Sequence, residues 1–192
     1  MLEKIKELDI NLLVYLNGLG SEKYDGFWLI ITHQLYWTPF FLFLFFLIYK
    51  KIGVKQTLYL LLFVAVLIAF TDQTTNLFKH TFARLRPCNN PDLKGIIREV
   101  QVRNSYSFFS GHAANTMAVA TFLFLILKRY FKYLGFLFFW PLIFAYSRIY
   151  LGLHYPGDIL TGYLFGFLFG FLLSLVYKKL KPQYFPDTVK EI

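Results

Sequence analysis

The chain has 192 residues and a formal net charge of +9, and 57% of its residues are apolar. The apolar residues gather in long runs rich in phenylalanine, which argues against an ordinary soluble domain and for a bilayer as the solvent. Many basic residues flank these runs, and no basic stripe with aromatic stacking partners lies outside them, which argues against a nucleic-acid partner. The length is typical of a single domain, residues 1–192.

Residues 5–16 have apolar side chains at helical spacing. This segment carries too many charges to cross a bilayer, so we expect an amphipathic helix that lies in the membrane interface. Gly18 and Gly20 predict the end of that helix, because glycine is the residue that most often follows a helical segment.

Five apolar stretches follow, each long enough or nearly long enough for a spanning helix of about 20 residues. They cover residues 27–49, 56–77, 111–127, 133–150 and 159–177. Backbone groups in lipid must be satisfied internally, and the stretches lack the alternation of barrel strands. The sequence therefore predicts an all-α fold, a polytopic transmembrane helical bundle of about five spans.

Two features within these stretches predict local structure. Pro39 predicts a kink or break in the first stretch. Gly162, Gly166 and Gly170 recur every four residues in the last, and small residues at that spacing let helices approach closely. We expect this stripe to pack inside the bundle rather than to form a dimer face.

Basic residues mark one side of the predicted bundle. They follow the first, third and fifth stretches, as Lys50, Lys51, Lys55, Lys128, Arg129, Lys132, Lys178, Lys179 and Lys181. If all five stretches cross, these residues share one side, which the positive-inside rule makes cytoplasmic. The connections over residues 79–110 and 147–158 then lie on the opposite, extracytoplasmic side.

Polar residues with the chemistry of a reaction site gather in those two extracytoplasmic connections. They come from three separate parts of the chain, and they are Lys79, Arg86, Ser110, Gly111, His112, Arg148, His154 and Asp158. Arginine forks match phosphate oxygens in pairs, and lysine adds a point charge. Residues 110–112 open a helix, so their backbone N–H groups point at an anion under the helix dipole. The set predicts a phosphate site.

The histidines and the carboxylate supply catalytic groups. His154 can act as a nucleophile while Asp158 holds its second ring nitrogen, and this geometry follows if Pro156 begins the last helix. His112 can protonate the leaving oxygen as general acid. No carboxylate cluster suited to Mg²⁺ lies at this face, so we expect a reaction without metal or cofactor in which the cations neutralise the transition state.

The pattern Lys-x6-Arg-Pro, then Ser-Gly-His, then Ser-Arg-x5-His-x3-Asp covers residues 79–158. It resembles the three-part signature of the type 2 phosphatidic acid phosphatase and vanadium haloperoxidase superfamily. The resemblance implies that Lys79, Arg86 and Arg148 bind phosphate and that Ser110 and Gly111 stabilise the transition state. It also implies His112 as the acid, His154 as the nucleophile and Asp158 as its orienting partner. One position departs from the family pattern: Phe109 stands where proline is usual.

Two further polar residues are assigned to the surroundings of the site. Asp72 lies seven residues before Lys79, two helical turns along the same face. We expect it to pair with Lys79 or an arginine, with interfacial hydration as the alternative. Arg84 either touches the substrate or a lipid headgroup or is solvated. The loop over residues 91–104 overhangs the site and is placed to help choose the headgroup.

The function predicted from these features is hydrolysis of a lipid phosphate or pyrophosphate through a phosphohistidine intermediate. Candidate substrates are undecaprenyl pyrophosphate, phosphatidylglycerophosphate, phosphatidate and lipid A phosphate, and the resemblance slightly favours the first two. The expected location is the bacterial cytoplasmic (inner) membrane, with the active site on its periplasmic side. A vanadate-dependent haloperoxidase-like enzyme and a non-enzymatic lipid transporter or binding protein are the alternatives.

Overall fold

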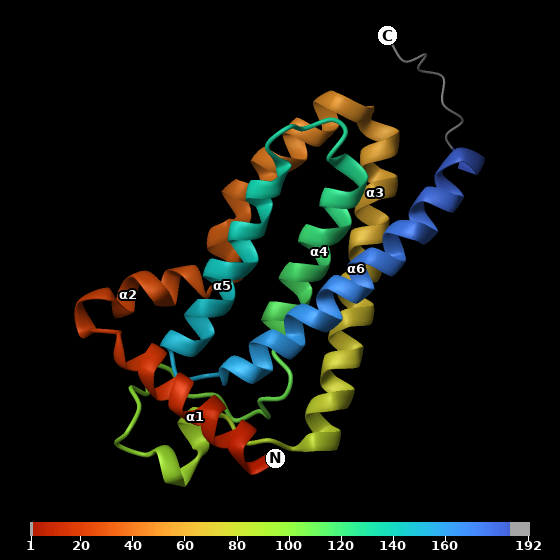
Figure 1. Ribbon diagram of the computed structural model, residues 1–192. Helices are drawn as coiled ribbons and strands as arrows, with labels where there is room; N and C mark the ends of the chain where they lie inside the picture. The colour runs from red at the N-terminus through yellow and green to blue at the C-terminus, as the bar shows by residue number, and fades with distance from the viewer. Residues whose placement is uncertain (1, 185–192) are drawn as a thin grey trace.

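The computed structural model describes residues 2–184, and within them the secondary structure is helical. Six α-helices, joined by turns, loops and short 3-10 helices, form an elongated bundle (Figure 1). Their bounds are α1 (Leu2–Gly18), α2 (Glu22–Ile31), α3 (Thr38–Phe82), α4 (Gly111–Leu127), α5 (Phe139–Tyr150) and α6 (Pro156–Tyr184). The all-α prediction is therefore confirmed, and α1 ends at Gly18 as predicted.

The first predicted span, residues 27–49, is wrong in its bounds. Helix α2 ends at Ile31, a short 3-10 helix covers Gln34–Trp37, and α3 begins at Thr38 with Pro39 in its first turn. Proline is tolerated there because the first N–H groups of a helix have no intrahelical partner. The break thus falls before Pro39, and Pro39 begins a helix instead of kinking one.

Helix α3 turns back on itself at Gly53. This glycine has φ 77° and ψ 168°, a conformation that is open almost only to glycine, and the chain reverses direction there (Figure 1). The two halves of α3 correspond to the first two predicted spans, and Lys50, Lys51 and Lys55 lie around the turn.

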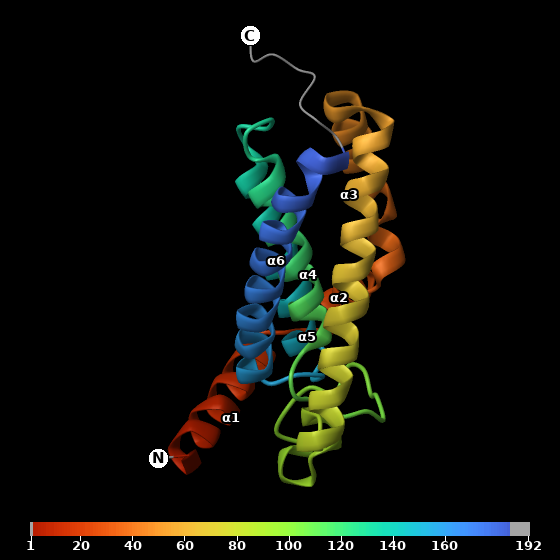
Figure 2. The same ribbon diagram turned by 90° about the vertical axis from the view of Figure 1, so that its right-hand side faces the viewer.

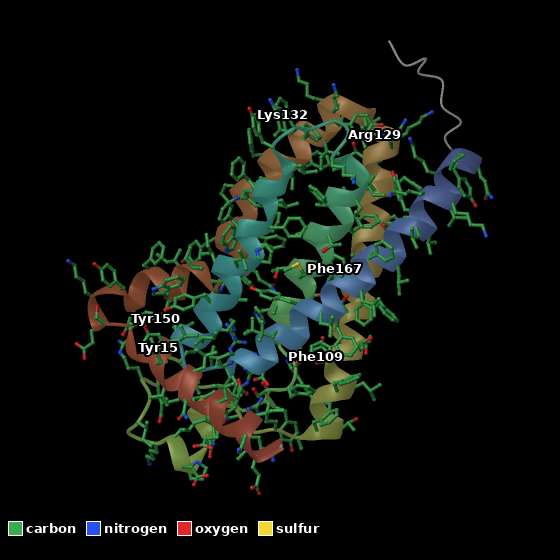
Figure 3. The ribbon with its side chains drawn as sticks, in the orientation of Figure 1. Tyr15, Phe109, Arg129, Lys132, Tyr150 and Phe167 are labelled. Carbon is green, nitrogen blue, oxygen red and sulfur yellow. The ribbon has the colours of Figure 1, made fainter. Side chains whose placement is uncertain are left out.

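The two ends of the bundle carry different groups. Arg129 and Lys132 lie at one end, whereas Phe109 and Tyr150 lie toward the other, beside the long 83–110 connection (Figure 3). Within the described residues, Gln34–Leu93 and Pro156–Tyr184 are long and apolar enough to cross a membrane, while Gly111–Leu127 and Leu134–Tyr150 are apolar but shorter. The count of five spans stays a prediction.

Helices α4 and α6 pack through the glycine stripe. A Cβ atom on Gly162 would lie 2.7 Å from the Ser110 carbonyl oxygen, and one on Gly166 would lie 2.3 Å from that of Ala114. Both distances are far shorter than van der Waals contact, so only glycine allows the two backbones to come this close. The prediction that the stripe packs inside the bundle is confirmed, and the contact fixes α6 against the first turn of α4.

Helix α1 lies at the same end as the 83–110 connection and runs obliquely to the bundle axis (Figures 1 and 2). Its Leu13 is fully buried in a cluster with Ile149 of α5 and Ile159 of α6. An apolar stripe on another face of α1 is exposed: Ile5, Leu8, Leu12 and Tyr15. This stripe fits the predicted interfacial helix.

Candidate active site

Three chain segments bring the predicted site residues to the end of the bundle where α1 lies. Lys79 occupies the last turn of α3, and the left-handed conformation of Ala83 (φ 45°) ends that helix and redirects the chain. Ser110 caps α4, with its hydroxyl oxygen accepting a hydrogen bond from the Ala113 N–H at 3.4 Å. Helix α6 begins at Pro156, as predicted.

Arg86 is held rigidly by the loops that surround it. Its Nε donates to the Ser105 carbonyl oxygen at 2.9 Å, and its Nη2 donates to the Ser105 hydroxyl at 3.0 Å. Its Nη1 donates to the Leu153 carbonyl oxygen at 2.8 Å and lies 3.0 Å from His154 Nε2. Because the guanidinium carries only donors, this contact assigns the lone pair to His154 Nε2.

The second ring nitrogen of His154 faces Asp158. His154 Nδ1 lies 3.3 Å from Asp158 Oδ2, so Nδ1 carries the proton and donates it to the carboxylate. The same oxygen accepts the Tyr155 N–H at 3.0 Å and the Ser107 hydroxyl. His154 and Asp158 are both fully buried. The carboxylate thus fixes the tautomer that leaves Nε2 free to attack an electrophile.

Arg148 is fully buried and only partly satisfied. Its Nη1 donates to the Thr32 hydroxyl at 2.5 Å, while its Nε and Nη2 have no partner among the described residues. A buried donor without a partner costs about 1–3 kcal/mol, and more when it is charged. Donors of this kind are suited to an anion that is bound during function.

A cavity of about 360 Å³ lies beside His112, and its lining does not include Arg86, Arg148 or His154. Lys79, Gly111 and His112 line its polar end, and Ile68 and Val119 line it farther along α3 and α4. The His112 ring stacks on Phe144 of α5, with ring centroids 5.5 Å apart. A tetrahedral anion at the polar end and an apolar chain along the helices fit such a cavity together.

The electrostatics of the site favour a neutral nucleophile. Burial lowers the pKa of His154 well below its usual 6.5, and the charges of Arg86, Arg148, Lys79 and Arg84 lower it further. Four cations therefore act on one imidazole, three from residues 79–86 and one, Arg148, from the end of α5. The ring stays uncharged at neutral pH, as a nucleophile must.

Arg84 and Asp72 also lie beside the site. Arg84 is ion-paired, with its side chain 29% exposed: its Nη1 donates to Asp158 Oδ1 at 2.8 Å and its Nη2 to Asp9 Oδ2 at 2.7 Å. Asp72 lines the same cavity as Lys79, and its Oδ1 accepts a hydrogen bond from Asn115 Nδ2 at 2.6 Å. The 91–104 loop, expected to overhang the site, packs against the His154 connection, with the Gln101 N–H donating to the Leu151 carbonyl oxygen at 3.3 Å.

Several partners of these residues were missed from the sequence: Asp9, Thr32, Ser105, Ser107 and Asn115. Most are single polar residues in loops or at helix ends, and no spacing rule links them to the site. Asp9 carried a signal, because it shares one face of an amphipathic helix with Leu13 and Asn17, at positions i, i+4 and i+8. Polar residues on a buried face require partners.

One end of the helical bundle surrounds a buried His–Asp pair with cations. This arrangement is typical of membrane enzymes that act on anionic substrates. A family model described as the PAP2 superfamily matches residues 56–182. The chain belongs to the PAP2 superfamily.

Three named relatives are phosphatases. A lipid A 4'-phosphatase of Bacteroides thetaiotaomicron is 32% identical, over 98% of this chain and 85% of that protein. A lipid A 4'-phosphatase of Porphyromonas gingivalis is 34% identical, over 84% of this chain and 69% of that protein. An undecaprenyl-diphosphatase of Sulfolobus acidocaldarius is 29% identical, over 84% of this chain and 71% of that protein.

Two crystal structures share the fold. The transmembrane PAP2-type phosphatidylglycerolphosphate phosphatase from Bacillus subtilis superposes with a TM-score of 0.70 at 19% identity, covering 93% of this chain and 88% of that one. LpxE from Aquifex aeolicus superposes with a TM-score of 0.65 at 24% identity, covering 88% of this chain and 96% of that one. The protein is thus a phosphatase of the PAP2 family with a membrane-type fold.

Proposed function

We propose that the protein removes phosphate from a lipid headgroup by transferring it first to His154 and then to water. The single observation that carries this proposal is the buried Arg148, whose two unpaired donors belong to the cluster of cations that act on His154. A phosphoryl group in that place satisfies Arg148 and meets the His154 lone pair. In the free enzyme, Arg86 Nη1 donates to that lone pair. When the phosphoryl group is bound, Arg86 Nη1 can donate to a phosphate oxygen instead.

The reaction has two steps. His154 Nε2 attacks phosphorus, the bond from phosphorus to the lipid oxygen breaks, and His112 gives that oxygen a proton. Water then attacks the phosphohistidine, His112 takes the proton of the water, and phosphate leaves. Lys79, Arg86 and Arg148 neutralise the oxygens that gather charge in both transition states, and Ser110 and Gly111 contribute from the start of α4.

The cation cluster supports a reaction that requires no metal. Lys79, Arg86 and Arg148 supply the positive charge that Mg²⁺ supplies in many phosphoryl transfers. Among residues 2–184, no three His, Cys, Asp or Glu side chains come together as metal ligands. Turnover is therefore expected to continue in EDTA.

The preferred substrate class is a lipid whose phosphate is attached to a sugar, as in lipid A. Two of the named relatives are lipid A 4'-phosphatases. The cavity carries polar groups suited to a sugar: Asp72 and Asn115 form a hydrogen-bonded pair, and Asn115 Oδ1 has no partner within residues 2–184. Sugar hydroxyl and amide N–H groups can donate to these oxygens, whereas a polyprenyl chain cannot. An ionisable side chain along a span is costly and therefore points to function.

Undecaprenyl diphosphate is the second candidate substrate. One relative is an undecaprenyl-diphosphatase, and the apolar part of the cavity beyond Ile68 and Val119 suits an isoprenoid chain. The location proposed for either substrate is the bacterial cytoplasmic membrane, with the site on its periplasmic side.

The test is phosphate release by the purified protein from a panel of lipid A bisphosphate, undecaprenyl diphosphate, phosphatidylglycerophosphate and phosphatidate, with EDTA present. We expect turnover that vanadate inhibits and that His154→Asn abolishes. Asn115→Ala is expected to lower kcat/KM for the sugar phosphate about tenfold, for one lost hydrogen bond to a polar group, and to leave the undecaprenyl rate unchanged. Normal turnover by His154→Asn, or a strict need for a divalent cation, would contradict the mechanism. Bromide oxidation with vanadate and peroxide would indicate the haloperoxidase alternative.

A further inference from the structure

The connection that carries His154 is short and has a helix on each side. Helix α5 ends at Tyr150 and α6 begins at Pro156, so only five residues, 151–155, join them. The position of the nucleophile therefore depends on how these two helix ends are held relative to each other.

Helix α1 binds both of these helix ends. At one point, Asn17 Nδ2 donates to the carbonyl oxygens of Tyr150 at 2.9 Å and Ile149 at 3.2 Å, which are acceptors at the end of α5. At the other, Asp9 Oδ1 accepts the N–H of Gly157 at 2.6 Å, in the first turn of α6. Both are groups that a helix leaves unsatisfied at its ends, and a carboxylate is favourable at a helix N-terminus. Asn17 lies eight positions after Asp9, about 12 Å along the helix.

Asp9 also holds Arg84. The Asp9 carboxylate accepts from Arg84 Nη2, while Arg84 Nη1 donates to Asp158 Oδ1. The Arg84 guanidinium lies 3.7 Å from the centroid of the Tyr155 ring, which supports it from one face. The side chain of Asp9 is 11% exposed and that of Arg84 is 29% exposed, so this ion pair is partly shielded from solvent.

The two oxygens of Asp158 have separate partners. Oδ1 receives Arg84, and Oδ2 receives His154 Nδ1, the Tyr155 N–H and Ser107. Because Arg84 occupies Oδ1, the carboxylate is fixed in the rotation that turns Oδ2 to the imidazole. If Arg84 paired with Asp158 alone, the two side chains could move together. The second ion pair, with Asp9, holds Arg84 in place and therefore also holds the Asp158 carboxylate.

We propose that Asp9 is a positioning residue for the reaction: through Arg84 and Asp158 it sets the orientation of the His154 ring. Helix α1 is then part of the catalytic framework, a strap across the connection that carries the nucleophile. This inference rests on the proposed function, because it assigns Asp9 and α1 to the same site.

The test compares kcat and KM of Asp9→Asn with those of the wild type, on any substrate that the wild type hydrolyses. Asp9 touches no part of the proposed phosphate site, so we expect kcat to fall about tenfold while KM changes by less than about threefold. In an Arg84→Gln background the further change Asp9→Asn should alter kcat by less than about threefold, because the residue through which it acts is already gone.

Asp25→Asn is the matched control. Asp25 forms an ion pair with Arg98 at 2.7 Å and accepts the Tyr150 hydroxyl at 2.8 Å, so it too joins an N-terminal helix to the 83–110 connection and to the end of α5, but neither contact reaches Asp158. Both variants should show a similar small fall in melting temperature, and only Asp9→Asn should lose kcat. Wild-type kcat in Asp9→Asn, an equal loss in Asp25→Asn, or independent losses in the double variant would overturn the inference. If His154→Asn stays active, the proposed function fails instead.

Discussion

At the scale of single residues, a few buried side chains in the site use some of their hydrogen-bonding atoms for contacts within the protein and keep others available to a ligand. One ring nitrogen of His154 donates to the Asp158 carboxylate. The other accepts from Arg86 Nη1, which can donate to a phosphate oxygen instead when substrate binds. Arg148 has one nitrogen bound to Thr32 and two left unpaired. These arrangements prepare the free protein for an anion. The lowered pKa of His154 follows first from burial and then from the cations that surround the ring.

The first prediction concerns pH. Because the pKa of His154 lies well below 6.5, the imidazole stays neutral until the pH falls through that lowered value, so the acid limb of kcat/KM should lie below pH 6.5. The groups that face His154 are Lys79, Arg84, Arg86, Arg148, His112 and Asp158. Arg84→Gln removes one cation and frees Asp158 for the imidazole, and both changes raise the pKa of His154.

The acid limb of Arg84→Gln should therefore lie at higher pH than that of the wild type. An aryl phosphate with an electron-poor leaving group suits this measurement, because its own second ionisation lies lower than that of an alkyl phosphate. Coincident limbs in the two enzymes would show that Arg84 does not act on His154.

The second prediction concerns Arg148. Arg148→Lys keeps the charge but loses the planar fork, so it cannot both bind Thr32 and present two further donors. We expect kcat/KM to fall about a hundredfold, or about 3 kcal/mol of transition-state stabilisation. Thr32→Val removes only the supporting hydroxyl and should cost about tenfold. Steady-state measurements of kcat/KM test this prediction, and an Arg148→Lys variant as active as the wild type would contradict the phosphate-binding role of Arg148.

At the scale of elements, the site depends on two close helix contacts. Helix α6 lies against α4 through the glycine stripe, which fixes Asp158 relative to Ser110, whose N–H donates to the Asp158 carbonyl at 3.0 Å. Helix α1 lies across the ends of α5 and α6. Each contact joins segments that are far apart in the chain, and together they hold the motif residues at one end of the bundle.

The third prediction concerns the α4–α6 contact. In Gly166→Ala, the new Cβ would lie 2.3 Å from the Ala114 carbonyl oxygen, so α6 must move away from α4. Such overpacking costs about 1–3 kcal/mol and should lower the melting temperature by several degrees, with a loss of activity. Gly26→Ala in α2 is the control, since nothing lies within 4 Å of its Cβ position. A fall in melting temperature for Gly26→Ala but none for Gly166→Ala would contradict the packing account.

The sequence predicted the helical segments better than their ends. The stretches over residues 111–127 and 133–150 were placed within a few residues, and Pro156 begins α6 as expected. The first stretch was misplaced, because apolar residues on both sides of Thr32, His33 and Gln34 together suggest one span, although the helix stops at these polar residues. The residues predicted to be catalytic could be singled out because their types and spacing carry chemistry. Asp9 was not, because its partners lie 75 and 148 residues away and nothing local marks such a pairing.

At the scale of the whole molecule, the bundle separates two chemically different ends. The basic turns lie at one end and α1 lies at the other (Figures 1 and 3). The buried His154–Asp158 pair lies where α1 binds the start of α6, and His112, in the first turn of α4, lines the cavity. This division is what a membrane phosphatase requires if its substrate stays in one leaflet while its headgroup reacts.

The fourth prediction concerns orientation in the membrane. In a Cys88→Ser background, single cysteines at Asn104 and Lys132 occupy opposite ends, and both positions are exposed. In intact bacterial cells whose outer membrane has been made permeable, a thiol reagent that cannot cross the inner membrane should label Asn104→Cys and leave Lys132→Cys unlabelled until the cells are lysed. The reverse pattern would place the site on the cytoplasmic side.

The phosphohistidine itself gives the most direct test of the central claim. With an aryl phosphate that has a good leaving group, the first step needs no general acid, so His112→Asn can still form the phosphohistidine. The second step then lacks its general base, so water cleaves the phosphohistidine slowly. We predict a burst of the aryl alcohol equal to the enzyme concentration and a base-stable, acid-labile phosphate on His154 by mass spectrometry, both absent in the His112→Asn, His154→Asn double variant. A burst that persists without His154, or a phosphate found on another residue, would contradict the account.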